Sequence, residues 1–265
     1  MPTVTVTFDT NVFSHVVRPE GCNDASLKEV CIKIADEIRR GTILPHVSET
    51  VFSLEGIQIK DRPNYFGNYR AATKSEQVPS DRPGMLCFRF TISPNQEGRP
   101  ESNPILKEKL ERSRAMGFKM LSAPRTGLPK SPDLKDSDFG PRTNEEMRAQ
   151  QDLYFEVGRF VDSLGAGFMA AKAIGDKHRT TEDVWYEALK HSSKNDAKHS
   201  IGEWADGDSI ATHVSYRLDY FCTRDEAKSA GSQSVFSSEN RAALTKQFGV
   251  KFVTPEELLA VVSKL

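Results

Sequence analysis

The two ends of the chain alternate short strand-like segments with amphipathic helical segments, and this alternation constrains the fold more than any other feature. Residues 4–8 alternate apolar and polar side chains as a strand does, and residues 26–39 place apolar side chains on one helical face before Gly41. Near the C-terminus, residues 220–223 and 250–253 are predicted strands, each followed by a predicted helix. Repeated strand–helix units form a mostly parallel sheet with helices on both faces. The sequence therefore predicts a three-layer α/β fold.

The middle of the chain interrupts this alternation. Ten of the 14 prolines lie between residues 63 and 141. Regular structure returns at Thr143, which opens a capping box for a helix predicted to run to about residue 173. The prediction is one domain with an elaborated insertion, divided as follows: domain 1–265, core 1–60 and 143–265, insertion about 61–142.

The predicted insertion has structure of its own. Residues 85–90 resemble one strand of a hairpin, and residues 105–116 predict a charged helix. Its apolar side chains are expected to be buried against some other part of the molecule: Leu86, Phe88, Phe90, Met116, Phe118, Met120 and Leu121. The segment is therefore expected to fold as part of the protein and not to act as a linker.

The net charge of −1 conceals an uneven distribution along the chain. Residues 62–148 contain 16 Lys and Arg against 11 Asp and Glu, a balance of +5, so the remainder of the chain carries −6. An acidic core with a basic insertion suits a metal site flanked by phosphate-binding groups, although ordinary scatter of charges gives the same balance.

Composition excludes several classes of protein. A chain with 37% hydrophobic and 28% charged residues is globular and not disordered. No apolar run approaches the roughly 20 residues of a membrane span, and the N-terminal segment lacks the basic and apolar regions of a signal peptide. The scattered cysteines have no zinc-site spacing: Cys22, Cys31, Cys87 and Cys222. We therefore expect a cytoplasmic protein with reduced thiols and no membrane segment.

Acidic residues follow or flank the predicted strands. Asp9 directly follows residues 4–8, and Asp225 lies two residues beyond 220–223. Four more acids lie on the helix predicted after Ser48 or at the start of a helix predicted over 206–217: Glu49, Glu55, Asp206 and Asp208. A single Asp after a strand is often only a turn or cap residue. Gathered at the carboxyl edge of a parallel sheet, however, such carboxylates repel one another unless a cation neutralises them. Oxygen ligands favour Mg²⁺ or Mn²⁺ over zinc.

Three segments, in this order, resemble the PIN-domain (PilT N-terminus-like) nucleases. FDTNVF at 8–13 resembles the opening motif of an apolar strand, Asp, Thr or Ser, and Asn. DSIATHVSYRLDYFCTRDEA at 208–227 is similar to the closing half, where a D-x-I-x-x-A helix and a strand lead into T-x-D. KFVTPEELL at 251–259 resembles the C-terminal strand and helix. The resemblance covers roughly residues 3–58 and 200–265 and implies a three-layer PIN-like fold with a long central insertion.

The resemblance implies a role for each matching residue. Asp9 is the first metal-binding acid, supported by Thr10 and Asn11. Thr223 positions Asp225 or a bound water. The implied catalytic set is Asp9, Glu55, Asp208 and Asp225, and the implied metal ligands are Asp9, Asp208, Asp225 and Asp206. In one respect the sequence departs from the family, because His213 occupies a helix position where a small residue is usual.

Two assignments within this set have alternatives. Glu55 shares a helical face with Val51 and Phe52 and is preferred over Glu49, which lies in the first turn as a supporting residue. Two residues apart on a helix, Asp206 and Asp208 would face nearly opposite ways. Asp208 matches the motif better, and Asp206 is interpreted as a cap or a second ligand.

The resemblance implies a Mg²⁺- or Mn²⁺-dependent endoribonuclease, in which the metal polarises the scissile phosphate and activates a water for in-line attack. The alternative is a catalytically inactive PIN-like module that binds RNA or protein. A haloacid-dehalogenase-like phosphatase is disfavoured, because it requires a second Asp where this chain has Asn11. The partners to expect are RNA, an inhibitor or antitoxin-like protein if the chain is a toxin, and further copies in a homo-oligomer.

Overall fold

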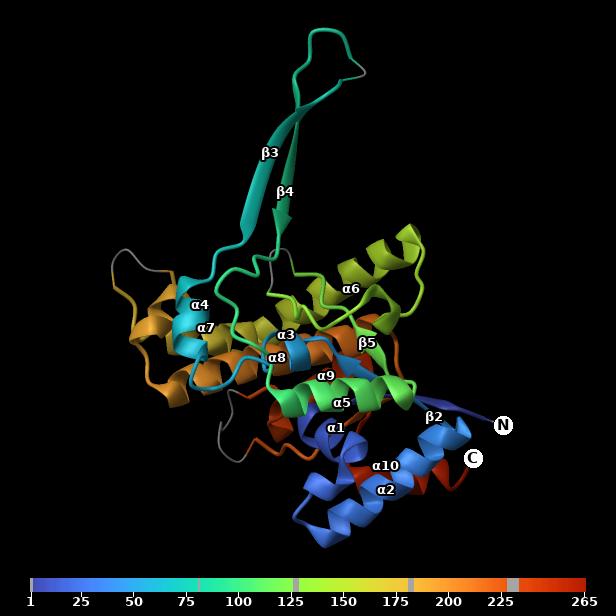
Figure 1. Cartoon of the computed structure of the whole chain (residues 1–265). Coiled ribbons are helices and arrows are strands. Elements are labelled where there is room, and N and C mark those ends of the chain that lie inside the picture. The colour runs from blue at the N-terminus through green and yellow to red at the C-terminus, as the bar shows by residue number, and fades with distance from the viewer. Residues whose placement is uncertain (1, 81, 126–128, 181–183, 228–233) are drawn as a thin grey trace.

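A parallel sheet of five strands lies at the centre of the molecule (Figure 1). The computed structural model describes residues 2–80, 82–125, 129–180, 184–227 and 234–265. In spatial order the strands are β5 (Lys119–Leu121), β2 (Ile43–Ser48), β1 (Val4–Phe8), β6 (Tyr220–Cys222) and β7 (Phe252–Val253). The predicted α/β class with a mostly parallel sheet is confirmed.

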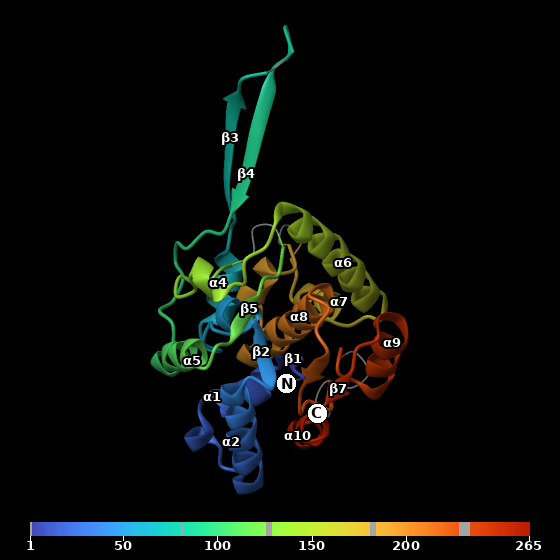
Figure 2. The ribbon, with the colours of Figure 1, turned by 90° about the vertical axis from the view of Figure 1, so that its right-hand side faces the viewer.

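Helices cover both faces of this sheet (Figure 2). One face packs against α1 (Thr10–Val17), α2 (Ala25–Arg40), α5 (Pro104–Ala115) and α10 (Pro255–Val262). The other packs against α6 (Asn144–Ser163), α8 (Lys194–Ser215) and α9 (Ser238–Phe248), while α7 (Phe168–Asp176) packs on α8. Alternation within β1 explains the two layers: Val6 and Phe8 enter the first apolar cluster, and Thr7 faces α8.

Short elements connect these layers. They are α3 (Thr50–Ser53), α4 (Arg62–Asn68) and three 3₁₀ turns, η1 (Pro19–Gly21), η2 (Asp136–Asp138) and η3 (Glu187–His191). The helix predicted after Ser48 is therefore a single turn, so Glu55 lies beyond its end. Within the described ranges no helix has both the length and the apolar character needed to cross a membrane.

Local sequence signals set several helix ends as predicted. Gly41 ends α2 in a left-handed conformation with φ of 78°. Thr143 and Glu146 form the capping box that opens α6, and Thr254 and Glu257 form another at α10. These ends depend only on neighbouring residues, which is why the sequence predicts them.

The helix predicted to run from Thr143 to about residue 173 is divided into α6 and α7. Gly165 and Gly167 lie in the break, with φ of 71° and 59°, a conformation that favours glycine. Gly167 also faces Gly207 of α8, where a Cβ atom would lie 2.8 Å from the Gly167 Cα. The break therefore lets α7 turn back and cross α8 at backbone contact.

The helix predicted over residues 206–217 begins earlier, at Lys194. Ser193 caps it by accepting a hydrogen bond from the Asp196 backbone amide at 3.0 Å. The first half of α8 is rich in polar residues, which is why the sequence does not predict its start. Three buried residues at four-residue spacing, Ala197, Ile201 and Ala205, nevertheless form an apolar stripe there. Asp206 and Asp208 consequently lie in the second half of a long helix and not at its beginning.

Residues 61–142 contribute to the core and also extend away from it. β5 joins the central sheet beside β2 and brings buried Met120 and Leu121 with it, as predicted. In contrast, β3 (Ala72–Val78) and β4 (Cys87–Ser93) pair only with each other in an antiparallel ribbon that projects from the body (Figures 1 and 2).

The predicted burial of the apolar side chains at the ribbon is wrong. The side chains of Leu86, Phe88 and Phe90 are 70%, 54% and 76% exposed. A two-stranded ribbon that projects from the body offers no second layer against which its faces could pack. The other apolar residues of the segment reach the core, with Phe118 buried and Met116 packed against it.

His213 fits within the buried interface between α8 and the sheet. Its Nδ1 lies 2.8 Å from the Thr7 hydroxyl, and its ring packs edge to face on Phe221. Burial lowers the pKa of His213 to about 3, so the ring is neutral at pH 7. A larger side chain is accommodated at this position because β1 supplies a polar partner.

Candidate active site at the carboxyl edge of the sheet

The carboxyl ends of β1 and β6 meet where the strand order reverses. From β1 the chain proceeds to β2 and β5 on one side, whereas β6 and β7 lie on the other. Ligands of parallel α/β sheets bind in the crevice at this switch point. Asp9 directly follows β1, and Thr223 directly follows β6. The fold thus brings the two ends of the sequence together at the expected binding edge.

The Asp9 carboxylate is held by three hydrogen bonds. Its Oδ1 accepts from the Thr10 amide at 2.7 Å, which caps α1. Its Oδ2 accepts from Asn11 Nδ2 at 2.7 Å and from Thr223 Oγ1 at 2.6 Å. Asn11 in turn accepts from the Arg224 amide at 3.2 Å. One carboxylate therefore serves as a helix cap and as the link between the first and last parts of the chain.

Thr223 also connects Asp9 to Asp225. The Asp225 amide donates to Thr223 Oγ1 at 3.0 Å, and Asp225 Oδ1 accepts from the Ala227 amide at 2.7 Å. Arg241 donates to the backbone oxygen of Asp225. These contacts fix a second carboxylate beside the first.

Glu55 reaches the same edge from the turn after α3. Its Oε2 accepts a hydrogen bond of 2.5 Å from the hydroxyl of Thr10. The buried Arg62 donates to the backbone oxygens of Glu55 and Ile57, both at 3.0 Å, and so fixes the turn. Burial raises the pKa of Glu55, and the Thr10 hydrogen bond and the Arg62 charge partly offset that rise.

α8 supplies two further acids, Asp206 and Glu203. Burial raises the pKa of Asp206 well above its usual range, and surrounding negative charges raise it further. Those charges belong to Asp9, Glu55, Glu203 and Asp225. Glu203 lies three residues before Asp206 on the same helix, and burial together with the Asp225 charge raises its pKa to about 7. We call these five residues, Asp9, Glu55, Glu203, Asp206 and Asp225, the acidic cluster.

The cluster carries more negative charge than its buried surroundings favour. Burial, followed by the charges of Glu55 and Asp225, raises the pKa of Asp9 to about 7 although the Thr223 hydrogen bond opposes the rise. Protons or a cation must therefore compensate these carboxylates near neutral pH.

The donor atoms of the cluster suit a hard divalent cation, because all of them are carboxylate oxygens. The Oε2 atom of Glu203 is buried and has no hydrogen-bond partner among the described residues. Among the described residues, no group of three or more His, Cys, Asp or Glu side chains is arranged closely enough to hold a metal ion. A cation would therefore have to draw the carboxylates closer together to complete its coordination.

Asp208 and Glu49 lie outside the acidic cluster. Asp208 Oδ1 accepts from Arg125 Nε at 2.7 Å, and Glu49 Oε1 accepts from the Ala123 amide at 2.7 Å. Both carboxylates are fully buried. A two-residue step turns a helix by about 200°, so Asp208 faces the opposite way from Asp206. The structure thus groups Asp206 and Glu55, not Asp208 and Glu49, with Asp9 and Asp225.

A pocket of about 520 Å³ adjoins the acidic cluster and brings positive charge to it. Thr10 and Glu55 line it together with Lys60, Arg62 and Lys109. Lys109 Nζ donates to Ser14 Oγ at 2.9 Å. We call this the Lys109 pocket. No sequence motif marks the lysines and the arginine of this pocket as functional residues. Glu203 of the acidic cluster could have been predicted, because it lies three residues before Asp206 on the same helix.

No family model, curated protein or solved structure matches the chain. The chemistry of the acidic cluster and of the Lys109 pocket is therefore the basis for assigning a function.

Replacing Asp9 with asparagine is expected to change the pH dependence of stability in metal-free protein. Between the unfolded pKa of about 4 and the folded pKa of about 7, the native state retains a proton that the unfolded state releases. Stability from this group therefore falls as the pH rises through that window. The free energy of unfolding of Asp9→Asn, relative to that of wild type, should therefore rise by about 2 to 4 kcal/mol between pH 4.5 and pH 8.

Urea unfolding in EDTA across this range measures the difference. The exposed Asp152, changed to asparagine, is the matched control and should differ little from wild type at every pH. A stability difference between Asp9→Asn and wild type that stays constant with pH contradicts the raised pKa.

Proposed function

We propose that this chain is a metal-dependent ribonuclease of the PIN-domain type, which hydrolyses phosphodiester bonds. One observation carries the proposal: carboxylates from distant segments, at residues 9, 55, 203, 206 and 225, gather at the switch point of a parallel sheet. Burying carboxylates that repel one another lowers the free energy of unfolding. A bound divalent cation would offset this loss by neutralising their charge.

Asp9, Asp206 and Asp225, with Glu55, are the residues that would hold Mg²⁺ or Mn²⁺. Such an ion supplies Lewis-acid polarisation of the phosphate and lowers the pKa of water. Asn11 and Thr223 keep the Asp9 carboxylate in place through hydrogen bonds of 2.7 and 2.6 Å. The side chains are therefore oriented before substrate arrives.

Glu203 has the properties of a general base in this reaction. Its pKa is raised to about 7, close to the pH at which an efficient base operates. Ser234 and Val235 hydrogen-bond to the carboxylate and oppose the rise in its pKa, whereas its buried Oε2 makes no hydrogen bond to a described residue. Asp206, about one turn further along α8, is influenced by the charges of Glu203 and of the other three acids.

The substrate class follows from charge and from the resemblance. Lys60 and Lys109 offer cations beside the cluster, where a phosphate next to the scissile one would lie. RNA is the usual substrate of the PIN nucleases that residues 8–13 and 208–227 resemble. An inhibitor or antitoxin-like partner stays a prediction of that resemblance, and a homo-oligomer and a cytoplasmic location stay predictions from the sequence.

Metal binding is tested by thermal unfolding at pH 7.5 with and without Mn²⁺. Saturating Mn²⁺ should raise the Tm of wild type by roughly 5 °C or more, and EDTA should reverse the shift. Asp206→Asn should show little shift, because it removes a central ligand. An equal shift in both proteins places the Mn²⁺ elsewhere and contradicts the proposed site.

A further inference from the structure

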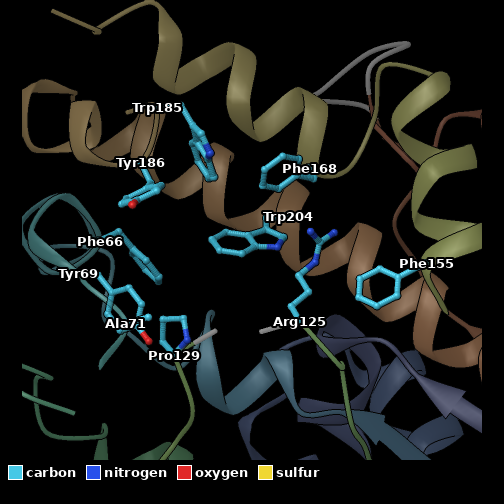
Figure 3. A pocket seen from close by; sticks show the side chains of 10 residues that line it. All are labelled: Phe66, Tyr69, Ala71, Arg125, Pro129, Phe155, Phe168, Trp185, Tyr186 and Trp204. Atoms are coloured by element: carbon cyan, nitrogen blue, oxygen red, sulfur yellow. The ribbon is translucent and has the colours of Figure 1, made fainter. Parts of the chain in front are cut away.

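A second pocket, on the opposite side of α8 from the acidic cluster, is lined mainly by aromatic side chains. Its volume is about 480 Å³, which is within the range of small-molecule sites. Figure 3 shows the lining side chains around it, with Arg125 next to Trp204. They are Phe66, Tyr69, Ala71, Arg125, Pro129, Phe155, Phe168, Trp185, Tyr186 and Trp204. We call this the aromatic pocket.

The rings in this pocket pack edge to face. Trp185 meets Phe168 at a centroid distance of 5.4 Å and an angle of 90°, and meets Trp204 at 5.6 Å and 70°. Tyr186 meets Trp185 at 5.8 Å and 89°. The walls of the pocket are therefore mainly aromatic, and base–aromatic stacking is the contact that such walls can offer to a planar ligand.

Two side chains of the pocket, Arg125 and Trp204, have hydrogen-bond donors without partners among the described residues. Arg125 uses Nε for Tyr154 and Asp208, and its two Nη groups make no hydrogen bond to a described residue. Its guanidinium lies over Phe168 and Trp204, 5.0 and 5.9 Å from their ring centroids. Trp204 Nε1 is buried and has no acceptor within the described ranges. A planar ligand with acceptors at its edge would satisfy these donors.

We infer that the aromatic pocket binds an unpaired guanine base of the RNA substrate, an inference that rests on the proposed ribonuclease function. Guanine presents O6 and N7 as adjacent acceptors, which match two parallel N–H groups of an arginine. Adenine presents an amino donor in place of O6. Unpaired bases are also the part of RNA that aromatic side chains stack on.

Two helices connect the aromatic pocket to the acidic cluster. α8 carries Trp204 on one side and Asp206 on the other. α4 carries Arg62, which contacts the Glu55 backbone, and Phe66, which lines the aromatic pocket. Four residues apart on a helix, these two side chains are neighbours, with about 5 to 6 Å between Cβ atoms. α4 therefore spaces the turn that holds Glu55 and the aromatic pocket by about one helical turn.

Tryptophan fluorescence tests the inference, since Trp185 and Trp204 are the two tryptophans of the chain and both line the pocket. In EDTA, where cleavage cannot occur, GMP should quench emission saturably after correction for nucleotide absorbance. AMP should bind about 5- to 100-fold more weakly. Arg125→Lys keeps the charge beside Asp208 but loses the planar fork, so it should lose the preference for GMP. Equal binding of GMP and AMP by wild type overturns the guanine assignment.

Ala71→Phe fills the pocket without removing any contact and should abolish the saturable quench. Ala242→Phe makes the same exchange at an exposed position of α9 and should bind GMP like wild type. Single-stranded RNA containing guanine should bind wild type more tightly than it binds Ala71→Phe, whereas a fully paired duplex should bind the two proteins equally.

If wild type binds GMP but shows no such difference with RNA, the ligand is a free nucleotide and the RNA assignment is overturned. If GMP causes no quench at all, the assignment of this pocket as a binding site is overturned. All these binding measurements are made without metal. Their results therefore do not depend on whether the protein cleaves RNA in the presence of Mn²⁺.

Discussion

Replacing Arg125 with alanine is expected to lower the free energy of unfolding by about 3 to 5 kcal/mol, the cost of leaving a buried charge without its partner. Asp208 is fully buried, and Arg125 Nε donates to its Oδ1 at 2.7 Å. Burial raises the pKa of Asp208, and the Arg125 charge and hydrogen bond offset only part of that rise. Urea unfolding at pH 7.5 measures the loss.

An exposed pair with the same separation provides the control. Arg40 Nη1 lies 2.7 Å from Glu37 Oε1, but the Arg40 side chain is 69% exposed. Arg40→Ala should therefore cost less than about 1 kcal/mol. Adding Asp208→Asn to Arg125→Ala should recover part of the stability, because it removes the uncompensated charge. If Arg125→Ala proves as mild as Arg40→Ala, the pair has no structural role.

Replacing Asp206 with asparagine is expected to reduce Mn²⁺-dependent RNA cleavage by about 100-fold or more, a loss of about 3 kcal/mol of transition-state stabilisation. The same change should stabilise the metal-free protein, since it removes one of several carboxylates that repel one another. A variant that loses activity but gains stability identifies a residue that serves function and lowers the stability of the fold. The measurements are kcat/KM with RNA and urea unfolding in EDTA.

Asp208→Asn is the matched comparison, two residues away on the same helix. It breaks the ion pair with Arg125 and should lower stability, while cleavage per folded molecule stays within a few-fold of wild type. The two aspartates should therefore show opposite patterns. If Asp208→Asn abolishes cleavage in folded protein and Asp206→Asn does not, the metal site contains Asp208, as the PIN motif implies.

The parts of the fold that depend on local signals could be predicted from sequence. The alternation in β1 and the caps at Gly41 and Thr143 are set by neighbouring residues. A hairpin strand is predicted at residues 85–90, but the exposure of its apolar side chains could not be, because apolar alternation at Phe88 and Phe90 normally indicates a buried face. Whether a second layer exists to cover such a face depends on distant parts of the chain.

The candidate site shows the same division. Asp9 and Asp225 could be predicted because they follow strands whose carboxyl ends meet. Helix geometry predicts that Asp206 and Asp208 face opposite ways, but it does not specify which side meets the sheet edge. That orientation is set by the contact of Gly207 with Gly167 and by the Arg125 partner of Asp208, neither of which is near in sequence.

The most direct test of the central claim is Mn²⁺-dependent cleavage of mixed cellular RNA by wild type and by Asp9→Asn. Asparagine keeps the size of the Asp9 side chain, but it lacks the charge that a divalent ion requires. Wild type should cleave RNA with Mn²⁺, EDTA should stop the reaction, and Asp9→Asn should not cleave. Equal cleavage by both proteins would show that Asp9 holds no catalytic metal, and cleavage by neither would favour a PIN-like module that binds RNA or protein without cutting.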